Sequence, residues 1–183
     1  MIKKFFIFII FIILLNKSYA NDLSSFNIDG LTLGDDLNFF FEDKDIKKLT
    51  KNYHSDKTFI PIEKKSSSDD FEVIQIYYKN NNSEKKIYAI AGINNLDVKK
   101  CLDEKKTYKD KFEFLFPNSN YKKNTIKNDY MAGKRVKFEE RFINQNNNYA
   151  WVACYDWNTE SKFKDQIRVG LTHNEFDKWV YSQ

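Results

Sequence analysis

Cysteine, proline and glycine are all scarce in this chain, which has two, two and five of them among its 183 residues. Cys101 and Cys154 lie too far apart for a CxxC redox motif and are too few for a Cys-only metal site. Proline occurs only at positions 61 and 117, and no Pro- or Gly-rich linker divides the chain. We therefore expect one globular domain over residues 21–183, with no metal and no cofactor.

Arginine is equally rare, because Arg135, Arg141 and Arg168 are the only three. Recognition of phosphate and base edges favours arginine. The formal net charge of +4 also depends on residues 1–20, which carry three lysines and no acid. Residues 21–183 hold 27 basic and 26 acidic side chains, a net charge of about +1. We therefore expect no nucleic-acid partner.

Long hydrophobic runs are missing after residue 21, and the one before it is short. Phe5–Leu15 is apolar throughout, but a membrane-spanning helix needs roughly 20 such residues. Lys3 and Lys4 precede this run, and Ser18-Tyr19-Ala20 follows it with small residues at 18 and 20. This pattern predicts a signal peptide over residues 1–20, cleaved between Ala20 and Asn21, although an uncleaved anchor is the alternative.

Cleavage would leave a protein in the periplasm, or secreted from the cell as the alternative. The residue directly after the cleavage site is Asn21, not cysteine, so we expect no lipid anchor, and the short apolar runs after residue 21 predict no membrane span in the cleaved protein.

An oxidising compartment favours a disulfide between Cys101 and Cys154. Cys101 falls on the apolar stripe of an expected helix, and Cys154 shares a strand face with Ala150 and Val152, where a helix can approach closely. The bond would close a loop of about 54 residues, worth about 4 kcal/mol in the chain-entropy description. Two unpaired cysteines in the core are the alternative.

The longest predicted helix covers residues 97–116, where apolar side chains recur every three or four positions. Asn95 can cap its beginning, and Pro117 ends it. Lys105 is the only charged residue in this stripe, and we expect its amine to reach solvent.

Six strands are predicted in two sets of three, at residues 58–62, 71–79, 86–93, 135–143, 148–157 and 165–171. Asp35 or Asp36 can begin a short helix that carries Leu37, Phe40 and Phe41 on one face. Thr172 and Glu175 match a capping box for a last helix. The expected fold is α+β, with two antiparallel meanders packed against one long central helix and with shorter terminal helices.

The best candidate for ligand binding is one face of the strand at 148–157, which presents Tyr149, Trp151, Tyr155 and Trp157. Such a row can stack on a sugar ring or hold a partner peptide. Aromatic rows on strands are also common in cores, and alternation does not separate the two interpretations.

No catalytic site is predicted, because no Gly-x-Ser-x-Gly motif or comparable nucleophile context is present. His54 and His173, the only histidines, are most simply solvated residues. We expect a protein that is not an enzyme and that binds an envelope protein or a small ligand. The alternatives are a structural or assembly factor, or an envelope hydrolase that uses Asp156 or Glu140 with His173, if these converge in a cleft.

Several segments resemble a group of uncharacterised small exported proteins of AT-rich marine alphaproteobacteria. They are residues 27–37 (NIDGLTLGDDL), 71–79 (FEVIQIYYK), Lys100-Cys101 and 151–157 (WVACYDW). The resemblance implies a signal peptide and a periplasmic address, and it supplies no activity.

Overall fold

The computed structural model describes residues 23–79, 84–130 and 133–182, without the side chains of residues 128–134. The predicted signal peptide and the cleavage site between Ala20 and Asn21 lie outside the described residues.

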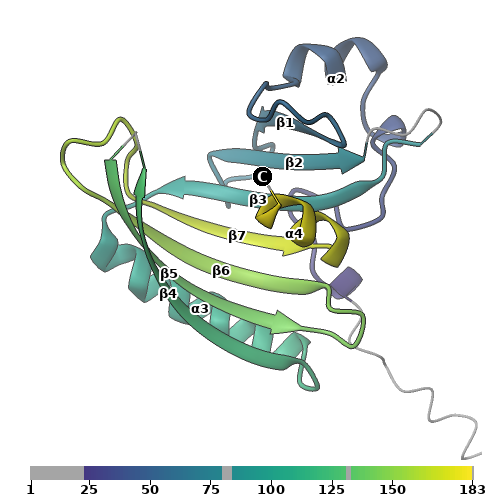
Figure 1. The fold of residues 1–183 in the computed structure, drawn as a ribbon. Helices are drawn as coiled ribbons and strands as arrows, with labels where there is room; N and C mark the ends of the chain where they lie inside the picture. The colour runs from purple at the N-terminus through teal and green to yellow at the C-terminus, as the bar shows by residue number, and fades with distance from the viewer. Residues whose placement is uncertain (1–22, 80–83, 131–132, 183) are drawn as a thin grey trace, which may run out of the picture.

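Seven antiparallel strands form one curved sheet in the order β1-β2-β3-β7-β6-β5-β4 (Figure 1). The strands are β1 (Phe59–Lys65), β2 (Val73–Lys79), β3 (Ile87–Asn95), β4 (Asn120–Tyr130), β5 (Gly133–Ile143), β6 (Tyr149–Trp157) and β7 (Gln166–Thr172). The shorter helical elements are η1 (Leu23–Ser25), η2 (Leu37–Phe39) and α2 (Asp43–Leu49). The helices on the sheet are α3 (Val98–Leu115) and α4 (Asn174–Tyr181).

The two helices on the sheet lie on opposite faces (Figure 1). Helix α3 covers β5, β6 and β7, and the main core lies between this helix and the sheet. There the ring of Phe112 contacts those of Phe26, Phe116 and Phe142. Helix α4 crosses the other face and packs through Phe176 and Trp179 against Phe59 and Ala89. No helix in the described part of the chain is long and apolar enough to cross a membrane.

The α+β class is confirmed, but the predicted layout of two meanders around a central helix is wrong. Strands β3 and β7 pair directly, from Ala89–Thr172 to Asn95–Gln166, and this pairing joins both sets into one sheet. Strand β4 was not expected, because its sequence NYKKNTIKNDY has little apolar alternation. It forms the edge of the sheet, where charged residues discourage pairing with another chain.

The beginnings of α3 and α4 and the extent of η2 differ from the expected ones. Asp97, not Asn95, caps α3 by accepting a hydrogen bond from the Lys100 amide. His173 caps α4, because Thr172 is still part of strand β7 and is therefore not the cap of a capping box. The expected helix after Asp36 is the single turn η2, and Phe40 is exposed rather than packed.

Lys105 does not reach solvent as expected. Its amine is buried and pairs with the carboxylate of Glu140 on β5, which faces α3. A buried charge needs such a partner, because removing one member leaves the other uncompensated in a low-dielectric core.

The predicted disulfide is present between Cys101 and Cys154, with an S–S distance of 2.04 Å. It ties the first turn of α3 to the middle of β6. Both cysteines are buried, and Cys154 lies on the face of β6 that also presents Ala150 and Val152. The small side chains let the helix approach as closely as the sequence suggests.

A second tie holds the N-terminal segment to the sheet. The buried carboxylate of Asp29 pairs with Lys64 and accepts hydrogen bonds from the Ser66 and Ser67 hydroxyls and from the Ser67 and Ser68 amides. Burial alone would raise the pKa of Asp29, but these partners lower it from 3.8 to about 2.

We predict that replacing both cysteines by alanine lowers the free energy of unfolding by about 4 kcal/mol, because the denatured chain gains the freedom of the opened loop. Urea denaturation measures the change. Reductant should destabilise the wild type to a similar extent and leave the double variant unchanged. Two free thiols in denatured, unreduced protein would contradict the bond.

We predict that Asp29→Asn lowers the free energy of unfolding by about 2 kcal/mol at pH 7, because charge-assisted hydrogen bonds are lost. Asparagine tolerates the positive φ of 57° at this position, so the backbone is not strained. The depressed pKa stabilises the folded wild type fully above about pH 4, and this contribution is lost as the pH falls toward 2. Urea titrations across this range should show the gap between the two proteins closing; a constant gap would contradict the assignment.

Candidate ligand-binding site

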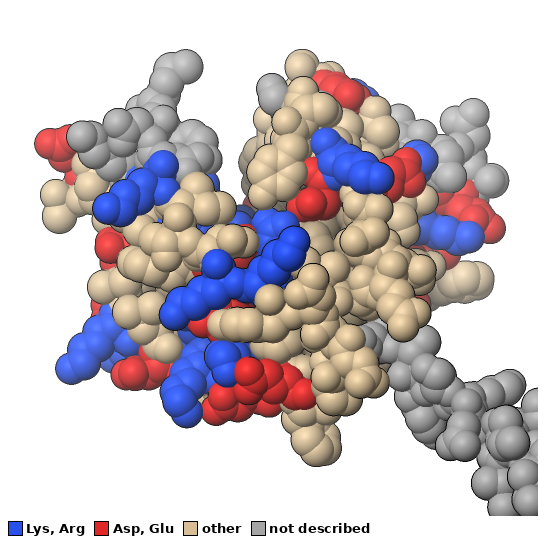
Figure 2. Space-filling view, turned by 60° about the horizontal axis from the view of Figure 1, so that its bottom comes forward, with Lys and Arg blue, Asp and Glu red and all other residues tan. Residues whose placement is uncertain are grey.

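The alternation of β6 places its predicted aromatic row on the face opposite α3. Tyr149, Trp151 and Tyr155 line a cavity of about 400 Å³ between this face and α4. The same side of the molecule is hollowed, with lysine and arginine side chains beside the hollow (Figure 2). Trp157 does not join this cavity and instead packs against Phe163, with ring centroids 4.8 Å apart. Three of the four predicted ligand-binding residues therefore meet in one place.

Small residues keep the middle of this face open. Ala89 and Ala91 of β3 line the cavity, and Gly170 of β7 lies beneath the indole of Trp151. A Cβ atom on Gly170 would lie only 2.6 Å from Trp151 Cε2. The Trp151 Nε1–H donates to the Thr172 hydroxyl at 2.9 Å, which fixes the ring flat against the sheet. The glycine thus allows an aromatic floor for the cavity.

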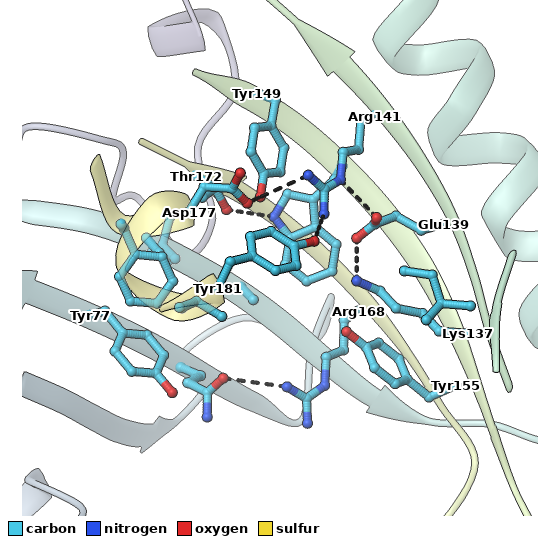
Figure 3. A pocket seen from close by; sticks show the side chains of 18 of the residues that line it. Tyr77, Lys137, Glu139, Arg141, Tyr149, Tyr155, Arg168, Thr172, Asp177 and Tyr181 are labelled. Atoms are coloured by element: carbon cyan, nitrogen blue, oxygen red, sulfur yellow. Dashed lines mark hydrogen bonds and ion pairs between the residues drawn. The ribbon is translucent and has the colours of Figure 1, made fainter. Parts of the chain in front are cut away.

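Helix α4 forms one wall of the cavity and is fastened to the sheet by polar contacts (Figure 3). The Tyr149 hydroxyl donates to Asp177, and Arg141 donates to the Tyr181 hydroxyl at 3.1 Å. Arg141 also lies 3.5 Å from Asp177. Burial and the Asp177 contact raise the pKa of Tyr149 well above its ordinary value, so the hydroxyl keeps its proton.

Strand β5 supplies a row of charged side chains beside the aromatic row. Arg135, Lys137, Glu139 and Arg141 all line the cavity, and Arg168 joins them from β7. All three arginines of the chain are therefore in this one place. Two carboxylates, Glu139 and Asp177, accompany these four basic groups.

Glu139 neutralises part of this charge from a nearly inaccessible position. Its carboxylate bridges Lys137 and Arg141, and the Arg141 Nε–Glu139 Oε2 distance is 2.7 Å. Burial alone would raise the pKa of Glu139, but the two adjacent cations outweigh burial and hold it below its ordinary value. The group is thus ionised at neutral pH, and the cluster keeps an excess of positive charge.

Three cations lie close to the ring of Tyr155. The guanidinium carbons of Arg135 and Arg168 lie 4.9 and 5.0 Å from the centroid of its ring, and the amine of Lys137 lies 5.5 Å away. Arg168 also donates from Nη1 to the Gln75 side chain at 3.4 Å. Its Nε is buried and has no hydrogen-bond partner among the residues that the structure describes. A ligand acceptor at this position would satisfy that donor.

The histidines occupy structural positions near the cavity. His54 lines it, with its ring 4.8 Å from that of Trp179, and burial lowers its pKa. His173 accepts a hydrogen bond from the Glu175 amide through Nδ1 as the cap of α4. Neither is the fully solvated residue that the sequence suggested.

The residues of the alternative hydrolase are not brought together. Glu140 pairs with Lys105 under α3, whereas His173 caps α4 on the other side of the sheet. Asp156 lies toward the far end of β6, where burial and the neighbouring Asp165 raise its pKa. No group of three or more His, Cys, Asp or Glu side chains that could hold a metal occurs within residues 23–79, 84–130 and 133–182.

The row of charged side chains on β5 was not predicted, although the sequence of the strand contains a pattern that indicates it. In β5, Arg135, Lys137, Glu139 and Arg141 alternate with residues that are apolar except for Glu140, namely Val136, Phe138, Glu140 and Phe142. Alternation with period two indicates one charged and one apolar face. The register then sets Lys137 opposite Tyr155 and Arg141 opposite Trp151, which the sequence does not reveal.

No protein-family description, curated protein or solved structure matches this chain.

We predict that Gly170→Ala lowers the free energy of unfolding by about 1–3 kcal/mol, because the new methyl group displaces the Trp151 indole from Thr172. Urea denaturation measures the loss. In a Trp151→Leu background the same substitution should cost much less, because the clashing ring is gone. An equal loss in both backgrounds would contradict the packing described.

Proposed function

We propose that the protein is a non-enzymatic binding protein that holds a small organic anion in the cavity beneath α4. We also propose that it is exported to the periplasm by its N-terminal signal peptide, with secretion as the alternative. The single observation that carries the binding proposal is the gathering of all three arginines in that cavity.

The choice of arginine supports an anionic ligand. Of the 30 basic residues of the chain, 27 are lysine. Lysine thus supplies the positive charge nearly everywhere except here. Guanidinium groups are planar, remain charged and bind carboxylates in pairs of parallel hydrogen bonds, which lysine does not do. Arginine side chains in a half-enclosed aromatic site therefore favour recognition of an anion over general solubility.

The electrostatic balance supports the same conclusion. Glu139 and Asp177 contact Arg141, and Glu139 also contacts Lys137. Arg135 and Arg168 add their charge on the other side, against Tyr155. Bringing like charges together out of water is unfavourable, and an anion bound among them would relieve that cost.

The proposed export is supported by two features of different kinds. The sequence begins with the charge and hydrophobic pattern of a signal peptide. The disulfide between Cys101 and Cys154 is the kind of bond that persists in an oxidising compartment. The resemblance to small exported proteins is consistent with this address.

We predict that organic anions bind the protein and that Arg168→Gln weakens binding roughly 10- to 100-fold, since a hydrogen-bonded charge is lost. A panel of carboxylates, sulfonates and phosphates, screened by thermal shift and quantified by calorimetry, tests this.

Lys106→Gln is the matched control, because it removes one positive charge from an exposed position on α3. It should leave the affinity unchanged. If no member of the panel binds, or if Arg168→Gln binds as tightly as the wild type, the proposed function is wrong.

A further inference from the structure

We propose that the ligand is an amphipathic carboxylate that lies along β6. Its carboxylate would sit between Arg135 and Arg168 beside Tyr155, and its apolar body would lie under α4. This inference rests on the proposed function and adds the orientation of the ligand in the cavity and its chemical class.

The two ends of the cavity are far enough apart to hold two parts of one molecule. Tyr149 and Tyr155 both line it and are six residues apart on β6, a distance of roughly 20 Å along a strand. Tyr149 pairs with Thr172, close to the beginning of α4, and Tyr155 pairs with Gln166 at the other end of β7. The cavity thus has an end at α4 and an end at Tyr155.

The end at Tyr155 is cationic. Arg135 and Lys137 come from β5 on one side of the Tyr155 ring, and Arg168 comes from β7 on the other. Figure 3 shows Lys137 and Arg168 on either side of Tyr155. Nη1 of Arg168 donates to Gln75, whereas its buried Nε–H and the adjacent Nη2–H form the other edge of the planar guanidinium, which suits the two oxygens of a carboxylate.

The end at α4 offers apolar surface. Phe176 and Val180 face the cavity from the helix, and Tyr77 and Ala89 face it from the sheet. The rings of Phe176 and Tyr77 are 4.6 Å apart, and Trp151 continues this surface toward the middle.

The polar groups at the α4 end are already engaged with one another. Asp177 accepts from Tyr149, and Arg141 contacts Asp177, Tyr181 and Glu139. These contacts hold α4 on the sheet. The carboxylate of Asp177 would repel an anionic group of the ligand placed here. The negative charge of a ligand is therefore favoured at the Tyr155 end.

Calorimetry with hexanoate, octanoate and decanoate tests this orientation. Decanamide serves as the neutral analogue, and decyl phosphate serves as the alternative anion. Affinity should rise with chain length, up to about fourfold per buried methylene. Decanamide should bind at least tenfold more weakly than decanoate, and decyl phosphate should bind no more tightly than decanoate.

Variants at each end separate the two contributions. Arg168→Gln should weaken all three carboxylates by a similar factor and keep the dependence on chain length. Ala91→Leu should reduce that dependence by filling the floor of the cavity. Val180→Asn changes a partly exposed residue of α4 and should reduce it too, even if Ala91→Leu does not fold.

The outcomes distinguish this inference from the proposed function. If hexanoate binds as tightly as decanoate, an anion site exists but the apolar end is not used, and the proposed orientation of the ligand is wrong. If decyl phosphate or decanamide binds more tightly than decanoate, the carboxylate assignment is wrong. If no anion of any kind binds, the proposed function fails as well.

Discussion

The two-sided packing of β6 is the constraint on which the rest of the structure depends. Side chains alternate across a strand, so each face of β6 serves one purpose. Ala150, Val152 and Cys154 are small enough for α3 to approach, and the disulfide from Cys154 to Cys101 fixes the helix there. The opposite face is thereby left to Tyr149, Trp151 and Tyr155, which need room above them. Gly170 and the alanines of β3 supply that room, and α4 closes one side of it.

The charged side chains on the face of the sheet opposite α3 make two different kinds of contact. Arg141, Glu139 and Asp177 form a connected set that also binds Tyr149 and Tyr181, and this set holds α4 on the sheet. Because these contacts satisfy one another, they give the cavity a fixed wall. Arg135 and Arg168 instead face the ring of Tyr155. The contacts that hold α4 on the sheet and the two arginines beside Tyr155 thus lie at different ends of the cavity.

The sequence predicts local features of this fold better than the way its parts join. The periodicity of residues 97–116 and the alternation of 148–157 follow from spacing. The pairing of Cys101 with Cys154 was expected from an oxidising compartment and from the faces that the two residues occupy. The structure has all three. The β3–β7 pairing depends on contacts between residues distant in sequence, and the polar strand β4 carries no apolar pattern that would reveal it. For the candidate ligand-binding site, the aromatic row of β6 could be predicted from the sequence. The convergence of Arg135 with Arg168 could not, because it depends on the register of three neighbouring strands.

The presence of only three arginines makes one measurement especially direct, since each Nε–H gives its own signal in a nitrogen-15 NMR spectrum. Titration with decanoate should shift the Arg135 and Arg168 signals, assigned by single Arg→Lys variants. The Arg141 signal should move little, because Glu139 already holds its Nε. Saturating shifts of Arg135 and Arg168 together would support the central claim that these two residues bind an organic anion. If both signals stay in place while decanoate binds, or if Arg141 alone responds, that claim is contradicted.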